Sequence, residues 1–239
     1  MKICIKNGSF GYNKIELLNS INFDISTGKF TCIIGSNGSG KSTILKTLTK
    51  ELDLIKGEMY LDDISDNNLS IEKNISYLPA GLQDPLHITV GELANLSRFS
   101  MTNLSNWKPS KIDIAKVNNS LVKCNVKQFS NTLFTNLSSG EKQRVWLAFC
   151  IAQDKRFILL DESLSNLDYQ TRKTFFNMLK DISRNNIGIL LASHDLDMVE
   201  KFADRVIVIK NNSLIKLPKP FINLNQYLYS KLLVLTKIY

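Results

Sequence analysis

The sequence predicts an α/β fold: a core with a mixed sheet, an N-terminal antiparallel β subdomain and an inserted α-helical subdomain. Two apolar runs, residues 157–160 and 187–193, have the composition of strands that are buried on both faces, as in a parallel sheet. Residues 1–30 hold short alternating segments separated by turns, which favours an antiparallel ribbon. Between about residues 84 and 150 the apolar spacing is mostly helical. These three observations define the expected architecture.

The composition is that of a globular protein without a membrane span. The chain has 239 residues, 44% of them hydrophobic, which suffices for one large domain or a core with one inserted subdomain. Its apolar runs, such as residues 157–160 and 206–209, are far shorter than the roughly 18 to 20 residues that a spanning helix needs. No secretory signal is visible after Met1. We therefore expect a cytoplasmic protein.

Neither the charge nor the cysteines indicate a special partner. The formal net charge is +8, but the 30 Lys and Arg residues are spread along the chain without a basic block. We interpret this basicity as a solvated surface and expect no nucleic acid partner. The four cysteines lack the spacing of metal ligands or redox pairs, so we expect reduced packing residues: Cys4, Cys32, Cys124 and Cys150.

In the first half of the chain, short strands precede the helical insert. Strands are expected at residues 2–6, 8–11, 21–25, 29–34, 57–63 and 74–79, and a first helix at residues 43–50. Thr89 and Glu92 have the spacing of a capping box, which predicts the start of a helix. A further helix at residues 111–124 is expected to bury Ile114, Val117, Leu121 and Cys124.

In the second half, strands and helices alternate. Helices are expected from Gly140 to about Ala152 and at residues 169–183 and 195–204, and strands at residues 157–160, 187–193 and 205–210, followed by a turn at 211–213. We place the main domain at residues 1–217, with the helical subdomain at about 84–150, and expect residues 218–239 to form a helical tail that packs on the protein itself.

A phosphate-binding loop connects the strand at residues 29–34 to the first helix. The pattern G-x-x-x-x-G-K-[ST] is matched at every fixed position by Gly35, Ser36, Asn37, Gly38, Ser39, Gly40, Lys41, Ser42 and Thr43. Glycines let backbone N–H groups turn toward an oxyanion, and the helix directs its positive end to the same place. Lys41 would reach the β- and γ-phosphates, and Ser42 would bind Mg²⁺. A merely flexible Gly/Ser loop is the weaker interpretation.

Two acidic residues follow the buried strand at residues 157–160. Functional groups in parallel sheets project from the carboxyl ends of the strands, so these acids are expected beside the phosphate loop. Asp161 would hold Mg²⁺, and Glu162 would polarise the water that attacks the γ-phosphate. The alternative is that both are solubilising charges at a strand end.

Three more sites are candidates with simple structural alternatives. His194 ends the strand at residues 187–193 at the same sheet edge and would reach the γ-phosphate, although a histidine there is more often a cap or turn residue. Ser138, Ser139 and Gly140 start a helix and form a second anion site, although serine also caps ordinary helices. Tyr12, in a predicted loop, would stack on a base or be a half-buried turn aromatic.

The ordered motifs resemble the ATP-binding cassette (ABC) ATPase family over about residues 1–215. They are residues 35–43, 137–141, 158–162, 165–168 and 192–194. The resemblance implies a P-loop NTPase (RecA-like) core and a head-to-tail dimer in which Ser138 and Gly140 face the γ-phosphate held by the partner. It also implies that Tyr12 stacks on adenine and that Asp168 belongs to the nucleotide site. Residues 137–154 look most like the ATPase subunits of iron-siderophore, haem and cobalamin importers.

The sequence departs from the family pattern at three places. The signature has Ser139 and Glu141 where Gly and Gln are commonest, and Ser163 replaces a usual proline after the two acids. Ala80 replaces the glutamine that normally follows the strand at residues 74–79. In the family, that glutamine binds Mg²⁺ and contacts the membrane partner. Either Gln83 serves instead or this contact is missing.

The leading functional hypothesis is an ATPase subunit on the inner face of the cell membrane that drives a separate permease. Its cofactors would be ATP and Mg²⁺, and its partners a second ATPase subunit, permease subunits and an extracytoplasmic solute-binding protein. The alternative is a soluble cassette ATPase such as an iron–sulfur assembly factor. A nucleotide-dependent scaffold would lack Glu162 or His194.

Overall fold

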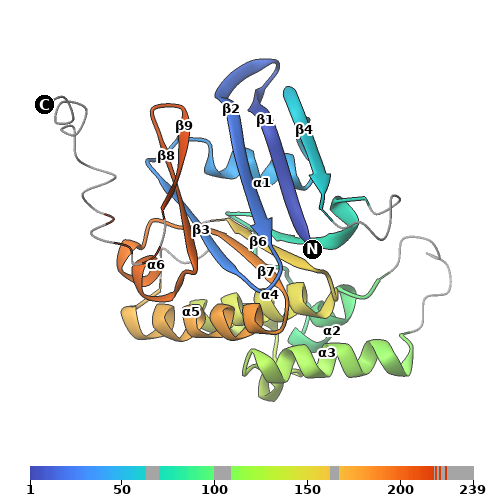
Figure 1. The fold of residues 1–239 in the computed structure, drawn as a ribbon. Helices are drawn as coiled ribbons and strands as arrows, with labels where there is room; N and C mark the ends of the chain where they lie inside the picture. The colour runs from blue at the N-terminus through green and yellow to red at the C-terminus, as the bar shows by residue number, and fades with distance from the viewer. Residues whose placement is uncertain are drawn as a thin grey trace, which may run out of the picture.

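A computed structural model describes residues 1–62, 70–99, 109–161 and 167–217, together with Lys219, Phe221 and Leu224. These residues form a three-stranded sheet of order β2-β1-β4 and a six-stranded sheet of order β5-β6-β7-β3-β8-β9, with helices packed against them (Figure 1). The predicted α/β architecture with an N-terminal antiparallel sheet is confirmed.

The N-terminal sheet consists of β1 (Lys2–Tyr12), β2 (Ile15–Ser26) and β4 (Lys56–Leu61), all antiparallel. The antiparallel ribbon was predicted, but two short strands were expected at residues 2–6 and 8–11 where the structure has the single strand β1. The expected break at residue 7 is a bulge inside β1, where Asn7 has a positive φ of 48° and the register shifts between Ile5 and Gly8. Tyr12 ends β1 and does not lie in a loop, which corrects the sequence-based prediction.

The main sheet is mixed. Strands β5 (Ile75–Leu78), β6 (Phe157–Asp161), β7 (Gly188–Ala192), β3 (Phe30–Gly35) and β8 (Arg205–Lys210) are parallel, and β9 (Ser213–Leu217) is antiparallel to β8. Every residue of β3, β6 and β7 is buried, as expected for the centre of a parallel sheet. Strand β9 was not predicted, because an edge strand with mostly exposed side chains carries a weak apolar pattern.

Alternate residues of the central strands pack into two cores on opposite faces of the sheet. Ile33 and Leu159 belong to the core shared with the N-terminal sheet and α1 (Lys41–Leu48). Ile34 and Leu160 belong to the other core. The remaining helices cover that second face: α2 (Val90–Leu96), α3 (Lys111–Lys123), α4 (Ser139–Ala152), α5 (Tyr169–Arg184) and α6 (Leu196–Phe202) (Figure 1).

Helices α3 and α4 begin and end within one residue of the predicted positions. The capping box of Thr89 and Glu92 is present at the start of α2. Val117 and Leu121 of α3 and its C-cap residue Cys124 are buried as predicted, but Ile114 is 45% exposed. At 100° per residue Ile114 lies at the edge of the buried stripe, so its predicted burial was wrong.

The four cysteines are free, as expected. Cys32, Cys124 and Cys150 are buried, and Cys4 is half-buried. Burial raises the pKa of the Cys150 thiol to about 11, so it is a neutral packing group at physiological pH.

The predicted helical tail at residues 218–239 lies outside the described residues except for Lys219, Phe221 and Leu224. The Leu224 side chain is buried, and its backbone N–H donates to Glu200 Oε1 at 2.7 Å. In the described part of the chain, no helix has the length and apolar character needed to cross a bilayer.

Candidate active site

The loop between β3 and α1 has the backbone geometry of an anion cradle. Gly38 and Gly40 have positive φ values of 74° and 104°, which side-chain-bearing residues rarely adopt. A Cβ on Gly40 would also lie 3.1 Å from Leu18 Cδ1. Within the described residues no side chain caps the amino end of α1, so its first N–H groups face the loop. Such donors favour a bound anion.

Lys41 is held directly over this loop. It is 3% exposed, and its Nζ donates to the carbonyl oxygens of Gly35 and Ser36 at 3.1 Å each. Ser42 follows in the first turn of α1 and is half-buried. Thr43 Oγ1 donates to the Tyr12 hydroxyl at 3.4 Å, so the 41% exposed ring of Tyr12 lies beside the start of α1.

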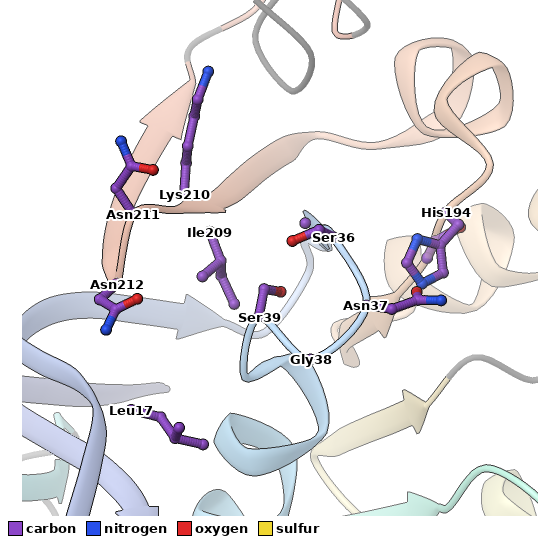
Figure 2. A pocket seen from close by; sticks show the side chains of 12 residues that line it. Leu17, Ser36, Asn37, Gly38, Ser39, His194, Ile209, Lys210, Asn211 and Asn212 are labelled. Carbon is purple, nitrogen blue, oxygen red and sulfur yellow. The ribbon is translucent and has the colours of Figure 1, made fainter. Parts of the chain in front are cut away.

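A cavity of about 950 Å³ opens beside the loop. This volume is near the upper end of the range of about 300–1,000 Å³ that is typical of ligand pockets. The lining residues come from β2, the loop, the end of β7 and the β8–β9 turn: Leu17, Gly35, Ser36, Asn37, Gly38, Ser39, Ser193, His194, Ile209, Lys210, Asn211 and Asn212. Figure 2 shows His194 and Asn37 on one side of the loop, and Leu17 and Asn212 on the other.

Asp161 lies at the same sheet edge as the loop. It pairs in register with Ala192, which pairs in turn with Ile33, so two strand spacings of about 5 Å each separate Asp161 from β3. Its side chain is 2% exposed. Burial, and then the Asp161 carboxylate nearby, raise the pKa of the Tyr77 hydroxyl on the adjacent strand β5. Glu162, the predicted base, lies outside the described residues.

The segment that carries His194 is anchored on both sides. Ser193 N donates to Ile33 O at 3.0 Å, which ties the end of β7 to β3. Asp195 accepts from Met198 N at 3.2 Å and so caps α6, and its carboxylate lies 2.9 Å from Nε of Arg172 on α5. Asp195, and not His194, therefore caps α6, so a capping role does not compete with a functional role of His194. His194 itself is exposed and lines the cavity.

The second predicted anion site does not line this cavity. Ser138 caps α4 in a capping box with Glu141, whose pKa is lowered by hydrogen bonds from the Ser138 hydroxyl and backbone. Gly140 packs so closely on α5 that a Cβ would lie 2.6 Å from Thr171 Cγ2. Asp168 caps α5 through Thr171 N at 3.0 Å. Ser138, Ser139, Gly140 and Asp168 are thus absent from the cavity lining of their own chain.

The segment after β5, where Ala80 replaces the family's glutamine, is exposed. Ala80 and Gln83 are both exposed and lie between β5 and α2. Asp84 is fixed by an ion pair of 2.6 Å with Lys142 Nζ on α4. The segment after β5 is therefore connected to the helix that starts at the second anion site.

Comparison with known proteins decides the family. Residues 18–165 match the family described as ABC transporter. The chain belongs to the ABC transporter family. It is the ATP-binding type of subunit, an ATPase whose activity is coupled to transport.

Several relatives and structures cover most of this ABC subunit. The achromobactin transport ATP-binding protein of Dickeya dadantii is 31% identical over 86% of this chain and 77% of its own length. The petrobactin import ATP-binding protein of Bacillus anthracis is 30% identical over 90% of this chain and 80% of its own. A dimeric bacterial ABC transporter cassette superposes with a TM-score of 0.72 at 25% identity, covering 90% of this chain and 98% of that chain.

Sequence reasoning missed part of the cavity wall of this ABC ATPase. Leu17 and Lys210 belong to no nucleotide-binding motif, and Asn211 and Asn212 were interpreted as a plain turn. The turn itself was correctly predicted. Its place beside the loop follows from the pairing of β8 with β3, which no local pattern reveals.

Proposed function

We propose that this ABC ATPase binds ATP with its phosphates in the cradle formed by residues 35–43 and hydrolyses it there. The observation that carries the proposal is the buried Lys41, whose ammonium lies 3.1 Å from two loop carbonyls at the uncapped start of α1. Lys41 would bind the β- and γ-phosphates, and Tyr12, beside Thr43, would stack on the adenine.

The residues at the sheet edge fit a magnesium ion. The Ser42 hydroxyl and the buried Asp161 carboxylate are oxygen donors of the kind that Mg²⁺ prefers. Bound there, Mg²⁺ supplies charge neutralisation for the β- and γ-phosphate oxygens. Glu162, which follows Asp161 directly in the sequence, would accept the proton of the attacking water. His194, at the cavity wall, would orient the γ-phosphate.

We further propose a head-to-tail dimer. Ser138, Ser139 and Gly140 form a helix start that does not line the cavity of its own chain, and Asp168 lies near them at the start of α5. In a head-to-tail pair these residues would complete the nucleotide site of the partner. The similarity to a dimeric cassette supports this arrangement.

The transported solute is proposed from the relatives. Proteins named for achromobactin and petrobactin transport are 31% and 30% identical to this chain, so an iron-siderophore is the favoured solute class.

In this proposal residues 1–217 form the ATPase domain with a helical subdomain at about 84–150. The subunit acts on the inner face of the cell membrane with a separate permease and an extracytoplasmic solute-binding protein. No feature of the described residues favours a soluble iron–sulfur assembly ATPase instead.

Purification from membranes tests the proposal. The tagged full-length chain is isolated from detergent-extracted membranes, its companions are identified by mass spectrometry, and the complex is placed in liposomes to measure ATP-driven uptake of labelled iron-siderophore. A polytopic membrane protein should co-purify, and Lys41→Ala should abolish uptake. Recovery of an active ATPase without any integral membrane protein would contradict the transport role. Uptake of other solutes but not of iron-siderophore would contradict the solute class.

A further inference from the structure

The turn between β8 and β9 places two asparagines at the cavity. Asn211 and Asn212 have positive φ values of 50° and 58°, and the flanking residues Lys210 and Ser213 pair across the hairpin. A two-residue hairpin turn of this kind is formed by asparagine or by glycine. The backbone geometry therefore does not by itself require an amide side chain at either position.

The position of the turn is set by the main sheet. Ile209 pairs with Gly35, the first residue of the phosphate loop, so the β8–β9 turn extends past the sheet edge directly beside that loop. In Figure 2 the Asn212 side chain lies on the Leu17 side of the turn, and the Asn211 side chain lies on the Lys210 side. Within the described residues, neither asparagine side chain makes a hydrogen bond, so both amides are available to a ligand.

The cavity has two chemically different ends. One end holds His194 and Asn37, and the other holds the apolar Leu17 side chain and the Asn212 amide, with the phosphate loop between them. If the terminal phosphate of ATP lies at the His194 end, as in the proposed function, the nucleoside part extends toward Leu17 and Asn212. An apolar surface beside an amide suits a sugar, since an amide both donates to and accepts from hydroxyl groups.

We propose that Asn212 hydrogen-bonds the ribose hydroxyls of bound nucleotide while Leu17 packs against the sugar ring. Asn212 is then a specificity-determining residue of the nucleotide site. This inference rests on the proposed function, because it takes the orientation of the nucleotide from it.

The test compares ADP with 2′,3′-dideoxy-ADP, neither of which the ATPase hydrolyses. Their dissociation constants are measured by calorimetry on the full-length chain with Mg²⁺. A net hydrogen bond of ordinary strength predicts that the wild type prefers ADP by about 2- to 10-fold. Asn212→Gly retains the turn but removes the amide, so it should weaken ADP binding by that factor and leave dideoxy-ADP binding unchanged. Asn211→Gly is the matched control and should keep the wild-type preference.

Each other outcome has a defined meaning. An Asn212→Gly chain that still prefers ADP, equal weakening of both nucleotides, or the same loss in Asn211→Gly would overturn the ribose contact. A wild type that binds both nucleotides equally would overturn it as well. Failure of the proposed function looks different: the wild type would bind neither nucleotide, or Lys41→Ala would bind both as well as the wild type does.

Discussion

The ammonium of Lys142 lies 2.6 Å from the carboxylate of Asp84 and so joins helix α4 to the exposed segment after β5. Lys142 lies four residues after Ser138, at the start of the helix proposed to face the partner's nucleotide. Asp84 is adjacent to Gln83, the candidate for the missing glutamine contact. The ion pair therefore connects two segments that are proposed to respond to nucleotide and to permease.

The first prediction concerns this pair. Asp84→Asn should change the free energy of unfolding by less than about 1 kcal/mol, because the pair is partly exposed to solvent. It should nevertheless reduce the stimulation of ATPase activity by the permease, since α4 and the segment after β5 would no longer move together. Chemical denaturation and steady-state ATPase assays on the co-purified complex provide the measurements.

A matched control for this variant exists at the other end of α4. Asp154→Asn breaks another surface pair, with Lys116 at 2.6 Å, just after the carboxyl end of α4, whereas Lys142 lies in its first turn. Asp154 has a positive φ of 59°, which asparagine tolerates. Equal loss of stimulation in both variants would show that the Lys142–Asp84 pair has no particular role in coupling.

The second prediction concerns nucleotide binding. Lys41→Ala should lower ATPase activity by at least about 10²-fold, as expected for removal of a fixed charge that stabilises the transition state, and should strongly weaken ATP binding. Lys46→Ala, in the last turn of the same helix, is the control for loss of a lysine and should keep activity. Undiminished hydrolysis by purified Lys41→Ala would remove the central role given to the loop.

The third prediction separates binding from hydrolysis. Glu162→Gln should lower turnover by roughly 10²- to 10⁴-fold while ATP binding is retained, because the amide cannot accept a proton. ATP and Mg²⁺ should then trap the head-to-tail dimer, which size-exclusion chromatography detects. The double variant Lys41→Ala/Glu162→Gln should stay monomeric. A Glu162→Gln chain that binds ATP and remains strictly monomeric would count against the dimer arrangement.

The fourth prediction concerns Ala80 and Gln83. If Gln83 replaces the family's glutamine beside Mg²⁺, Gln83→Ala should reduce permease-stimulated ATPase activity by about 10- to 100-fold, the usual effect of losing an outer contact to a metal. Ala80→Gln in that background should partly restore it. Wild-type rates in Gln83→Ala would mean that coupling rests on other contacts, such as residues 86–90 and the helical subdomain.

Local sequence patterns were sufficient to predict the phosphate-binding loop and the strands at the centre of the main sheet. The phosphate loop, the buried strands β3, β6 and β7, and the placement of Asp161 and His194 at one sheet edge were predicted from the sequence. Glycines in a phosphate-loop pattern and apolar runs of strand length are local properties, so a sequence displays them directly. The shared sheet edge of Asp161 and His194 then follows from the general rule that strands buried on both faces belong to parallel sheets. The capping boxes at Thr89 and Ser138 are local for the same reason.

The tertiary structure decided what depends on contacts between distant residues. It made β1 one bulged strand, placed β9 beside β8, and gave the cap of α6 to Asp195 so that His194 remains exposed at the cavity. It also brought Leu17 and Asn212, 195 residues apart in the numbering, to the same cavity wall as the loop. Sheet pairing determines which distant segments lie side by side, and the periodicity within one segment does not indicate which segment pairs with it.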